Sequence, residues 1–237
     1  MKVIGMIGGM SWESTAEYYR IINQAVRSQL GGQHSAKALL YSVDFHEVEL
    51  LQREGRWDDA DALMVECARR LERGGADFIV LCTNTMHRCA SAIEDQIAIP
   101  LPHIADSTAM RIKEAGLRRV GLLGTKYTME QDFYKGRLTG RHRLDVIVPE
   151  ETDRDLVHAV IYDELCQGEI REASKAEYLR IMDDLSGRGA EGIILGCTEI
   201  MLLVKSEEAG LRLFDTTRVH AEEAVALALQ STDSNCR

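Results

Sequence analysis

The clearest structural signal in the chain is the segment Gly189-Ala190-Glu191-Gly192-Ile193-Ile194-Leu195-Gly196-Cys197-Thr198-Glu199. A short apolar run that ends at glycine is typical of a buried strand. The segment 75–85 (GADFIVLCTNT) has the same design, and aligning the two Gly-Ala pairs places Cys197 opposite Thr83. The repeat therefore predicts two equivalent strands whose carboxyl ends carry the polar residues of a site.

A second pair of segments repeats in the same order. Residues 3–9 (VIGMIGG) align with 119–125 (RVGLLGT), with Gly121 on Gly5 and Gly124 on Gly8. The two repeats have offsets of 116 and 114 residues, which is typical of a duplicated fold with altered loops. We predict an N-terminal lobe of residues 1–105 plus 210–237 and a C-terminal lobe of residues 106–209.

Apolar strands alternate with helical patterns in both halves. Strands are expected at 2–7, 37–43, 78–81, 119–125 and 144–148, with 44–47 as a loop. Helices are expected at 12–30, 58–73, 85–93, 107–115, 128–138, 153–166, 174–186 and 217–229. This alternation predicts an α/β fold of two pseudo-symmetric Rossmann-like lobes with mostly parallel sheets.

Four strand exits are predicted to form the site: 8–12, 83–85, 124–128 and 197–199. Ligands bind beyond the carboxyl ends of parallel strands, so we expect these exits to face each other across a cleft between the lobes. Glycine, serine and threonine at helix starts favour a carboxylate ligand. The glycine pattern matches neither the dinucleotide fingerprint nor the P-loop.

The bulk composition excludes several classes of protein. The net charge is −10 and the basic residues are spread along the chain, which argues against a nucleic-acid surface. No run of 18 apolar residues predicts a membrane span, and the N-terminus does not resemble a signal peptide. We expect a cytoplasmic protein that binds neither nucleic acid nor membrane.

The six cysteines form no C-x-x-C pair, so neither a disulfide framework nor a zinc site is expected. Cys67, Cys89 and Cys166 are interpreted as small buried residues. Cys236 lies in a polar tail that we expect to be disordered. Cys197 differs from these, because a helix N-terminus after it would lower its thiol pKa and favour a nucleophile or a base.

Whether Cys197 acts as a nucleophile or as a base depends on the side chains beside it. An acyl-transfer enzyme requires a histidine beside the thiol, and His87, four residues after Thr83, is the histidine best placed to reach the cleft. A core or helix-surface position for His87 is equally consistent with the pattern. No acyl-transfer motif occurs, whereas two acid/base groups on opposite sides of one carbon are suited to racemisation.

Three motifs resemble the aspartate/glutamate racemases: residues 6–11 (MIGGMS), 82–87 (CTNTMH) and 196–199 (GCTE). The aspartate racemase branch is the closest, because Gly8-Gly9-Met10 replaces the Asp-Ser-Gly of glutamate racemases. The resemblance implies cofactor-independent racemisation of acidic amino acids, a homodimer, and catalytic positions at Thr83 and Cys197. It implies substrate contacts at Met10, Gln52, Thr83, Asn84, Thr85 and Thr198, while Thr125 follows from its repeat position. Arg53 and Lys126 are candidates to hold the second carboxylate.

The sequence departs from the family at Thr83, where a catalytic cysteine is usual. Cys82 is one residue early, and neighbouring residues of a strand point to opposite faces, so only a bulge would bring it into the site. A hydroxyl is a weaker acid than a thiol. We therefore expect Cys197 to deprotonate L-substrates and D-substrates to react more slowly at saturation.

Two other interpretations are consistent with the sequence. A related reaction, such as hydantoin racemisation, maleate isomerisation or malonate decarboxylation, would also use a cysteine at a strand end. Alternatively, loss of the first cysteine would leave an amino-acid-binding protein without turnover.

Overall fold

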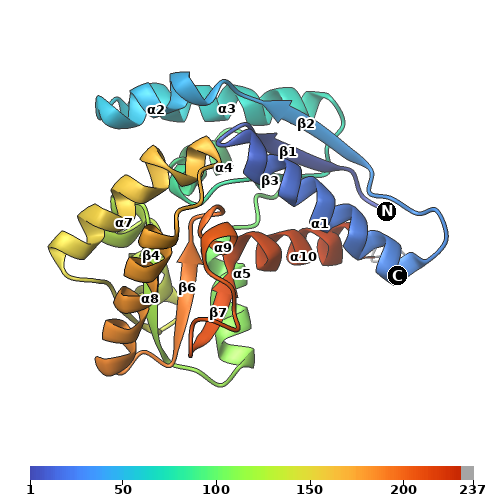
Figure 1. The fold of residues 1–237 in the computed structure, drawn as a ribbon. Helices are drawn as coiled ribbons and strands as arrows, with labels where there is room; N and C mark the ends of the chain where they lie inside the picture. Colours follow the sequence, from blue (N-terminus) through green and yellow to red (C-terminus); the bar gives the residue numbers. More distant parts are fainter. Residues whose placement is uncertain (231–237) are drawn as a thin grey trace. The chain divides into compact units, whose positions relative to one another are not determined.

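The computed structural model describes residues 1–230 and divides the chain into two compact units. Within the described residues, unit 1 contains Met1–His103 together with 220–230, and unit 2 is Ile104–Val219. Each unit has its own parallel sheet flanked by helices, as Figure 1 shows. The α/β class with two parallel sheets is therefore confirmed. The expected disorder at Cys236 lies outside the described residues.

Unit 1 is built on three parallel strands in the order β2-β1-β3: β1 (Ile4–Gly8), β2 (Ala38–Ser42) and β3 (Phe78–Leu81). Its helical segments are α1 (Trp12–Leu30), α2 (Phe45–Arg53), α3 (Trp57–Arg73), η1 (Thr85–Cys89), α4 (Ala90–Glu94) and most of α10 (Thr216–Leu229). Alternate residues of β3 enter two separate cores. Ile79 and Leu81 pack with residues of α3, whereas Phe78 and Val80 pack with residues of α1 and α10.

Unit 2 has four parallel strands in the order β5-β4-β6-β7: β4 (Arg119–Gly124), β5 (Asp145–Ile147), β6 (Gly192–Gly196) and β7 (Arg212–Asp215). Its helical segments are α5 (Ile104–Glu114), α6 (Lys126–Glu130), η2 (Arg137–Arg141), α7 (Glu151–Asp163), η3 (Leu165–Gln167), α8 (Glu172–Gly187) and α9 (Ile200–Leu203). The first three strands repeat the order of unit 1, with β4 central as β1 is.

The turn after β1 requires glycine. Gly9 has a φ of +93°, and a Cβ there would lie 2.2 Å from the Val43 carbonyl oxygen. The Gly9 amide donates to Thr15 Oγ1 at 2.8 Å, and the Ser11 side chain caps α1 by accepting from the Ser14 amide. The predicted turn and cap are therefore confirmed.

Several predicted elements differ in the structure. A loop was expected at 44–47, but residues 45–47 begin the helix α2, because Asp44 caps it by accepting from the His46 amide at 3.0 Å. The expected helix 128–138 is divided into α6 and a π-helical turn at 137–141. The sequence placed 210–219 in the N-terminal lobe, but β7 pairs with β6, so these residues lie in unit 2.

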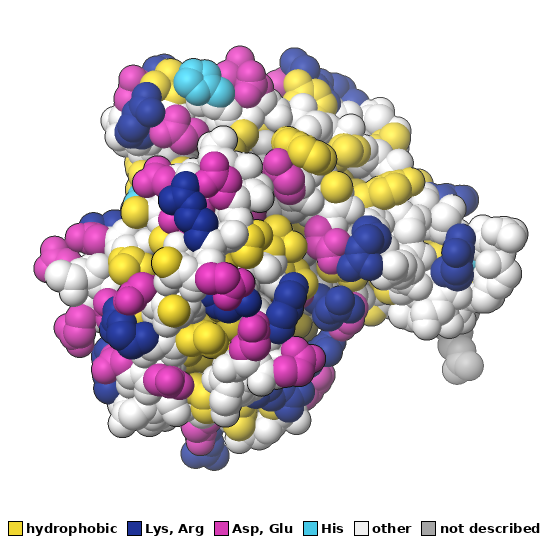
Figure 2. Space-filling model, in the orientation of Figure 1, with side chains coloured by type: hydrophobic (Ala, Val, Ile, Leu, Met, Phe, Trp, Pro, Cys, Tyr) yellow, Lys and Arg dark blue, Asp and Glu magenta, His cyan; other side chains and the backbone are white. Residues whose placement is uncertain are grey.

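The surface mixes charges of both signs. Figure 2 shows Lys and Arg side chains interspersed with Asp and Glu over the face in view, without a large basic patch. Within the described residues, no helix combines the length and apolarity needed to cross a membrane.

Candidate functional site

In unit 1 the predicted site residues gather where the strands of the sheet reach their carboxyl ends. β1 and β3 are parallel neighbours, with Ile7 paired to Leu81, so the exits 8–12 and 83–85 leave the same edge. Met10, Thr83, Asn84 and Thr85 are all buried. Adjacent strands thus bring together residues more than seventy positions apart in the chain.

Hydrogen bonds hold the Thr83 backbone at both its amide and its carbonyl. Its amide donates to the Leu81 carbonyl at 2.8 Å, which turns the chain sharply at the end of β3. Its carbonyl accepts a hydrogen bond of 2.7 Å from Nδ1 of His87, and the His87 amide donates to the Asn84 carbonyl. His87 therefore lies beside Thr83, as its spacing predicted, but as a buried ring bonded to the main chain.

Gln52 and Cys82 also lie near this exit. Gln52 projects from α2, and its Nε2 lies 3.0 Å from the Met86 sulfur. Cys82 is fully buried in the core that includes Tyr18 and Val80. Burial raises the pKa of the Cys82 thiol far above its ordinary value, and the thiol donates to the Val80 carbonyl at 3.7 Å. Cys82 is thus a core residue, in agreement with strand alternation.

In unit 2 the corresponding residues lie at the carboxyl ends of β4 and β6. Gly124 and Gly196 are direct partners in the ladder, and a Cβ on Gly124 would lie 2.8 Å from the Gly196 carbonyl oxygen. Their close approach brings Thr125 and Cys197 to adjacent exits. Thr125 is buried and caps α6, where its Oγ1 accepts from the Thr128 amide at 3.3 Å.

Cys197 is bonded to a carboxylate. Its thiol donates to Oε2 of Glu199 over 3.0 Å, and the Thr198 hydroxyl donates to the same oxygen over 2.6 Å. Glu199 is only 3% exposed. The two donors fix the carboxylate against the sulfur of Cys197.

The expected low pKa of Cys197 is wrong. Burial raises the pKa of this thiol well above its ordinary value, and the negative charge of Glu199 raises it further. The helix that follows, α9, has four residues and begins only at Ile200, so its dipole offers little compensation. In the resting protein Cys197 is therefore a neutral thiol that is hydrogen-bonded to the Glu199 side chain.

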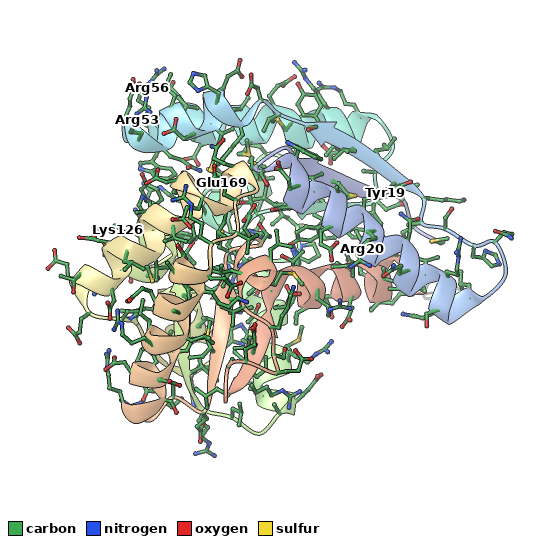
Figure 3. All side chains as sticks on the ribbon, viewed as in Figure 1. Tyr19, Arg20, Arg53, Arg56, Lys126 and Glu169 are labelled. Atoms are coloured by element: carbon green, nitrogen blue, oxygen red, sulfur yellow. The ribbon has the colours of Figure 1, made fainter. Side chains whose placement is uncertain are left out.

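The two candidate cations are already paired. Arg53 forms an ion pair with Glu49 at 3.1 Å and its side chain is 63% exposed. Lys126 is paired with Asp155. Figure 3 labels Arg53 at the end of α2 and Lys126 beside α7. Binding of a carboxylate by either one would first require loss of its present partner.

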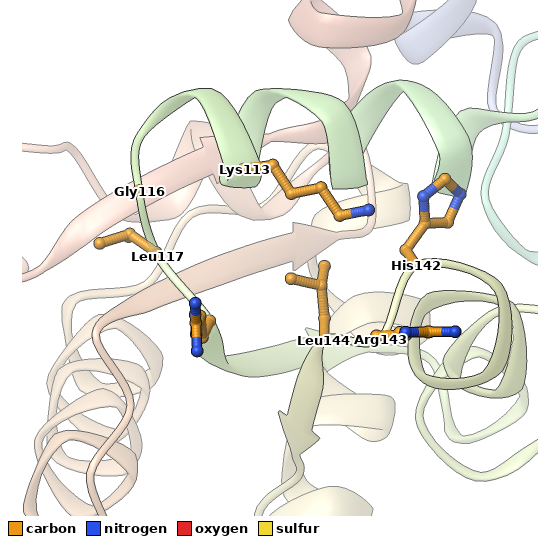
Figure 4. A pocket seen from close by; sticks show the side chains of 7 residues that line it. Lys113, Gly116, Leu117, His142, Arg143 and Leu144 are labelled. Carbon is orange, nitrogen blue, oxygen red and sulfur yellow. The ribbon is translucent and has the colours of Figure 1, made fainter.

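The structure offers no metal centre among residues 1–230, since no three His, Cys, Asp or Glu side chains there are grouped to hold an ion. A cavity of about 560 Å³ in unit 2 is lined by residues that include Lys113, Leu117 and His142 (Figure 4). It lies where β4 and β5 begin, at the opposite edge of the sheet from Cys197. It is therefore separate from the predicted site.

Sequence reasoning missed two sets of neighbours. The Gly-Cys-Thr-Glu motif contains Glu199 but predicts no role for it, although its spacing of two from Cys197 places both residues in one turn. The sequence also did not predict that the rings of His103 and His220 lie beside His87, because these residues are distant in the chain and meet only through packing.

Comparisons with known proteins show the family of the chain. The sequence matches the family described as Asp/Glu/Hydantoin racemase over residues 7–224. A candidate Asp/Glu racemase from Yersinia pestis is 55% identical, with a TM-score of 0.91, and the match covers 97% of this chain and 100% of the other. An aspartate racemase homologue from Pyrococcus horikoshii is 33% identical, with a TM-score of 0.82 and coverage of 96% and 99%.

A curated relative extends the comparison. The broad specificity amino-acid racemase RacX of Bacillus subtilis is 22% identical over 236 residues, which cover 97% of this chain and all of that protein. The family match covers most of the chain and spans the two strand exits described above. The protein therefore belongs to the Asp/Glu/hydantoin racemase family.

Proposed function

We propose that this protein racemises acidic amino acids, aspartate and glutamate, without a cofactor, with Cys197 as the base towards the L-enantiomer. The observation that carries the proposal is the 3.0 Å contact between the Cys197 thiol and the buried Glu199 carboxylate at the end of β6. Membership of the racemase family supports amino-acid racemisation, and the names of the relatives support acidic substrates.

The proposed first step transfers two protons. The α-C–H bond of the L-substrate breaks, and its proton passes to the Cys197 sulfur as the thiol proton passes to Glu199. The electron pair of the C–H bond moves into the substrate carboxylate, which becomes an enediolate. This coupling explains how a thiol with a raised pKa can act as a base, because free thiolate is never required.

The proposed second step returns a proton from the side of Thr83. The Thr83 hydroxyl, or a water that it positions, protonates the opposite face of the α-carbon. A hydroxyl is a poor base, so we expect D-substrates to turn over more slowly than L-substrates at saturation. The two enantiomers have equal free energy, so kcat/KM must be the same in both directions.

The remaining residues are proposed to bind the substrate. They are Met10, Gln52, Asn84, Thr85, Thr125 and Thr198, all of them buried at strand exits or, for Gln52, beside one. The hydroxyls of the three threonines and the amides of Gln52 and Asn84 suit the carboxylates and ammonium of an amino acid. We further propose a homodimer located in the cytoplasm, on the basis of the family resemblance, and light scattering after size-exclusion chromatography would test the dimer.

Solvent exchange tests the function directly. L- and D-aspartate and L- and D-glutamate are incubated with the protein in D2O, and loss of the α-proton is followed by NMR alongside chiral chromatography. We expect exchange and racemisation, with the L-acids exchanging faster at saturation. Absence of both with every acid would refute the proposal.

Hydantoins are the second candidate substrates, because the family description includes them. Racemisation of a 5-substituted hydantoin, with no reaction of the free acids, would assign the protein to that activity instead. Binding of the acids without exchange would indicate an amino-acid-binding protein.

A further inference from the structure

Three buried histidines form a cluster beside the Thr83 exit. The ring of His87 lies between those of His103 and His220, with centroid distances of 4.6 and 5.5 Å. All three are at most 4% exposed. Every one of them lies in unit 1, where His103 and His220 are the residues at which the chain leaves and re-enters that unit.

The hydrogen bonds assign the protonation of two rings. The Thr83 carbonyl can only accept, so Nδ1 of His87 must carry the proton in their 2.7 Å bond. Nε2 of His220 likewise donates to the Pro102 carbonyl at 3.1 Å. Nδ1 of His220 is then free to accept from the Tyr18 hydroxyl at 2.9 Å.

The cluster therefore holds the His87 ring in one orientation. His220 is fixed at both nitrogens, and its ring meets His87 edge-on at 65°. His103 covers His87 at a tilt of 57°. A ring packed in this way has little freedom to rotate, so its Nδ1–H keeps its direction towards Thr83.

We propose that His87 is a positioning residue that sets the direction of the Thr83 hydroxyl through the Thr83 carbonyl. The inference rests on the proposed function. Thr83 stands where β3 ends, and its backbone is bonded at both polar groups: the amide donates to the Leu81 carbonyl, and the carbonyl accepts from His87. The bond from His87 fixes the peptide group that follows Thr83, and together with the amide bond it sets the direction in which the Thr83 side chain leaves the backbone.

The role predicts a selective defect. Cys197 lies in unit 2 and has its own partner, Glu199, so removal of α-protons from L-aspartate should continue when His87 is replaced. Delivery of a proton on the Thr83 side should fail more often. The ratio of D-aspartate formed to L-aspartate exchanged should then fall.

The experiment compares His87→Leu with His87→Asn. Leucine fills the buried space without a donor, whereas the asparagine amide can replace the Nδ1–H. In D2O with L-aspartate, we expect H87L to lower the ratio of racemisation to exchange by about tenfold, the effect of one hydrogen bond. H87N should restore the ratio to near the wild-type value. His46→Asn, on an exposed position of α2, is the matched control.

The outcomes separate the two proposals. If the wild-type protein neither exchanges nor racemises the acid, the proposed function fails. If the wild type is active and H87L lowers exchange and racemisation equally, or H87N is as defective as H87L, the positioning role is wrong. Melting temperatures identify any variant that does not fold. If H87L does not fold, His87→Gln takes its place. The glutamine amide extends to the position of Nε2 and does not replace the Nδ1–H donor, so the same loss is expected.

If every wild-type exchange event is also a racemisation, the ratio of the two carries no information, and the racemisation rates of the variants are compared instead. H87L should then be about tenfold slower than H87N at equal thermal stability. Equal rates in the two variants would overturn the proposal.

Discussion

The two strand exits hold their key residues in opposite ways. At the end of β6 the side chain of Cys197 is bonded directly to the Glu199 carboxylate. At the end of β3 the main-chain carbonyl of Thr83 is bonded to the His87 ring. The two exits hold equivalent positions in the internal repeat but differ in chemistry: one carries a thiol bonded to a carboxylate, and the other carries a hydroxyl residue bonded through its main chain.

The largest effect should come from Cys197→Ser. A hydroxyl in place of the thiol would leave the exit with a group as weak as Thr83, so exchange of L-aspartate should fall by about a thousandfold or more. The matched control is Cys166→Ser, because Cys166 is also half-buried and packs against the same core of unit 2. Measurement is by NMR in D2O. A serine variant with near-normal exchange would show that the thiol is not the base.

Glu199→Gln should have the next largest effect. The amide keeps the shape but cannot take the thiol proton, so exchange of L-aspartate should fall by about a hundredfold. The exposed Glu207→Gln variant is the control. An unchanged exchange rate in E199Q would remove the carboxylate from the mechanism.

E199Q should also change the pH dependence of Cys197 alkylation. Glu199 raises the pKa of Cys197, so its neutralisation should lower that pKa, while burial still holds it above the ordinary value. The rate of Cys197 alkylation by iodoacetamide should therefore rise at a lower pH in E199Q than in the wild type. Peptide mass spectrometry isolates this cysteine from the others. A shift to higher pH would contradict the sign.

Thr83→Cys should make the two exits alike. A thiol at this position could take the α-proton of a D-substrate, so D-aspartate turnover at saturation should rise by about tenfold towards the L value. Thr83→Ser keeps a hydroxyl and should leave turnover nearly unchanged. If T83C brings no gain, a positioned water rather than the side chain is the acid on this side.

The contrast between the exits also explains what the sequence could reveal. The apolar runs and glycines before Thr83 and Cys197 predicted the parallel strands, because burial and turn geometry leave local patterns. The raised pKa of Cys197 could not be predicted, since it depends on how the folded chain desolvates the thiol and places Glu199 beside it. The cluster around His87 joins residues from three distant segments, so no spacing in the chain encodes it.

The smallest effect is a difference in acid stability between the units. Burial lowers the pKa of His220 to about 4, from 6.5, in a setting where Tyr18, the Pro102 carbonyl and the His87 ring face it. The unfolded chain therefore binds a proton that the folded unit excludes. Its contribution to stability is complete above pH 6.5 and is lost as the pH falls towards 4, about 3 kcal/mol in all.

Unit 2 has an opposing feature. Arg137 and His142 hold the pKa of Asp106 below its ordinary value of 3.8, despite its burial, so this carboxylate keeps its stabilising effect until the pH falls below that value. Unit 2 also contains His158, whose pKa is lowered by burial, but the cluster of three neighbouring rings belongs to unit 1.

Hydrogen exchange at pH 7 and pH 5, corrected for intrinsic rates, should show a larger loss of protection in β1 and β3 than in β4 and β6. His220→Gln should reduce that difference, and His34→Gln, at an exposed position, should not. Equal losses in both sheets would mean that neutral histidines do not set the acid limit of unit 1.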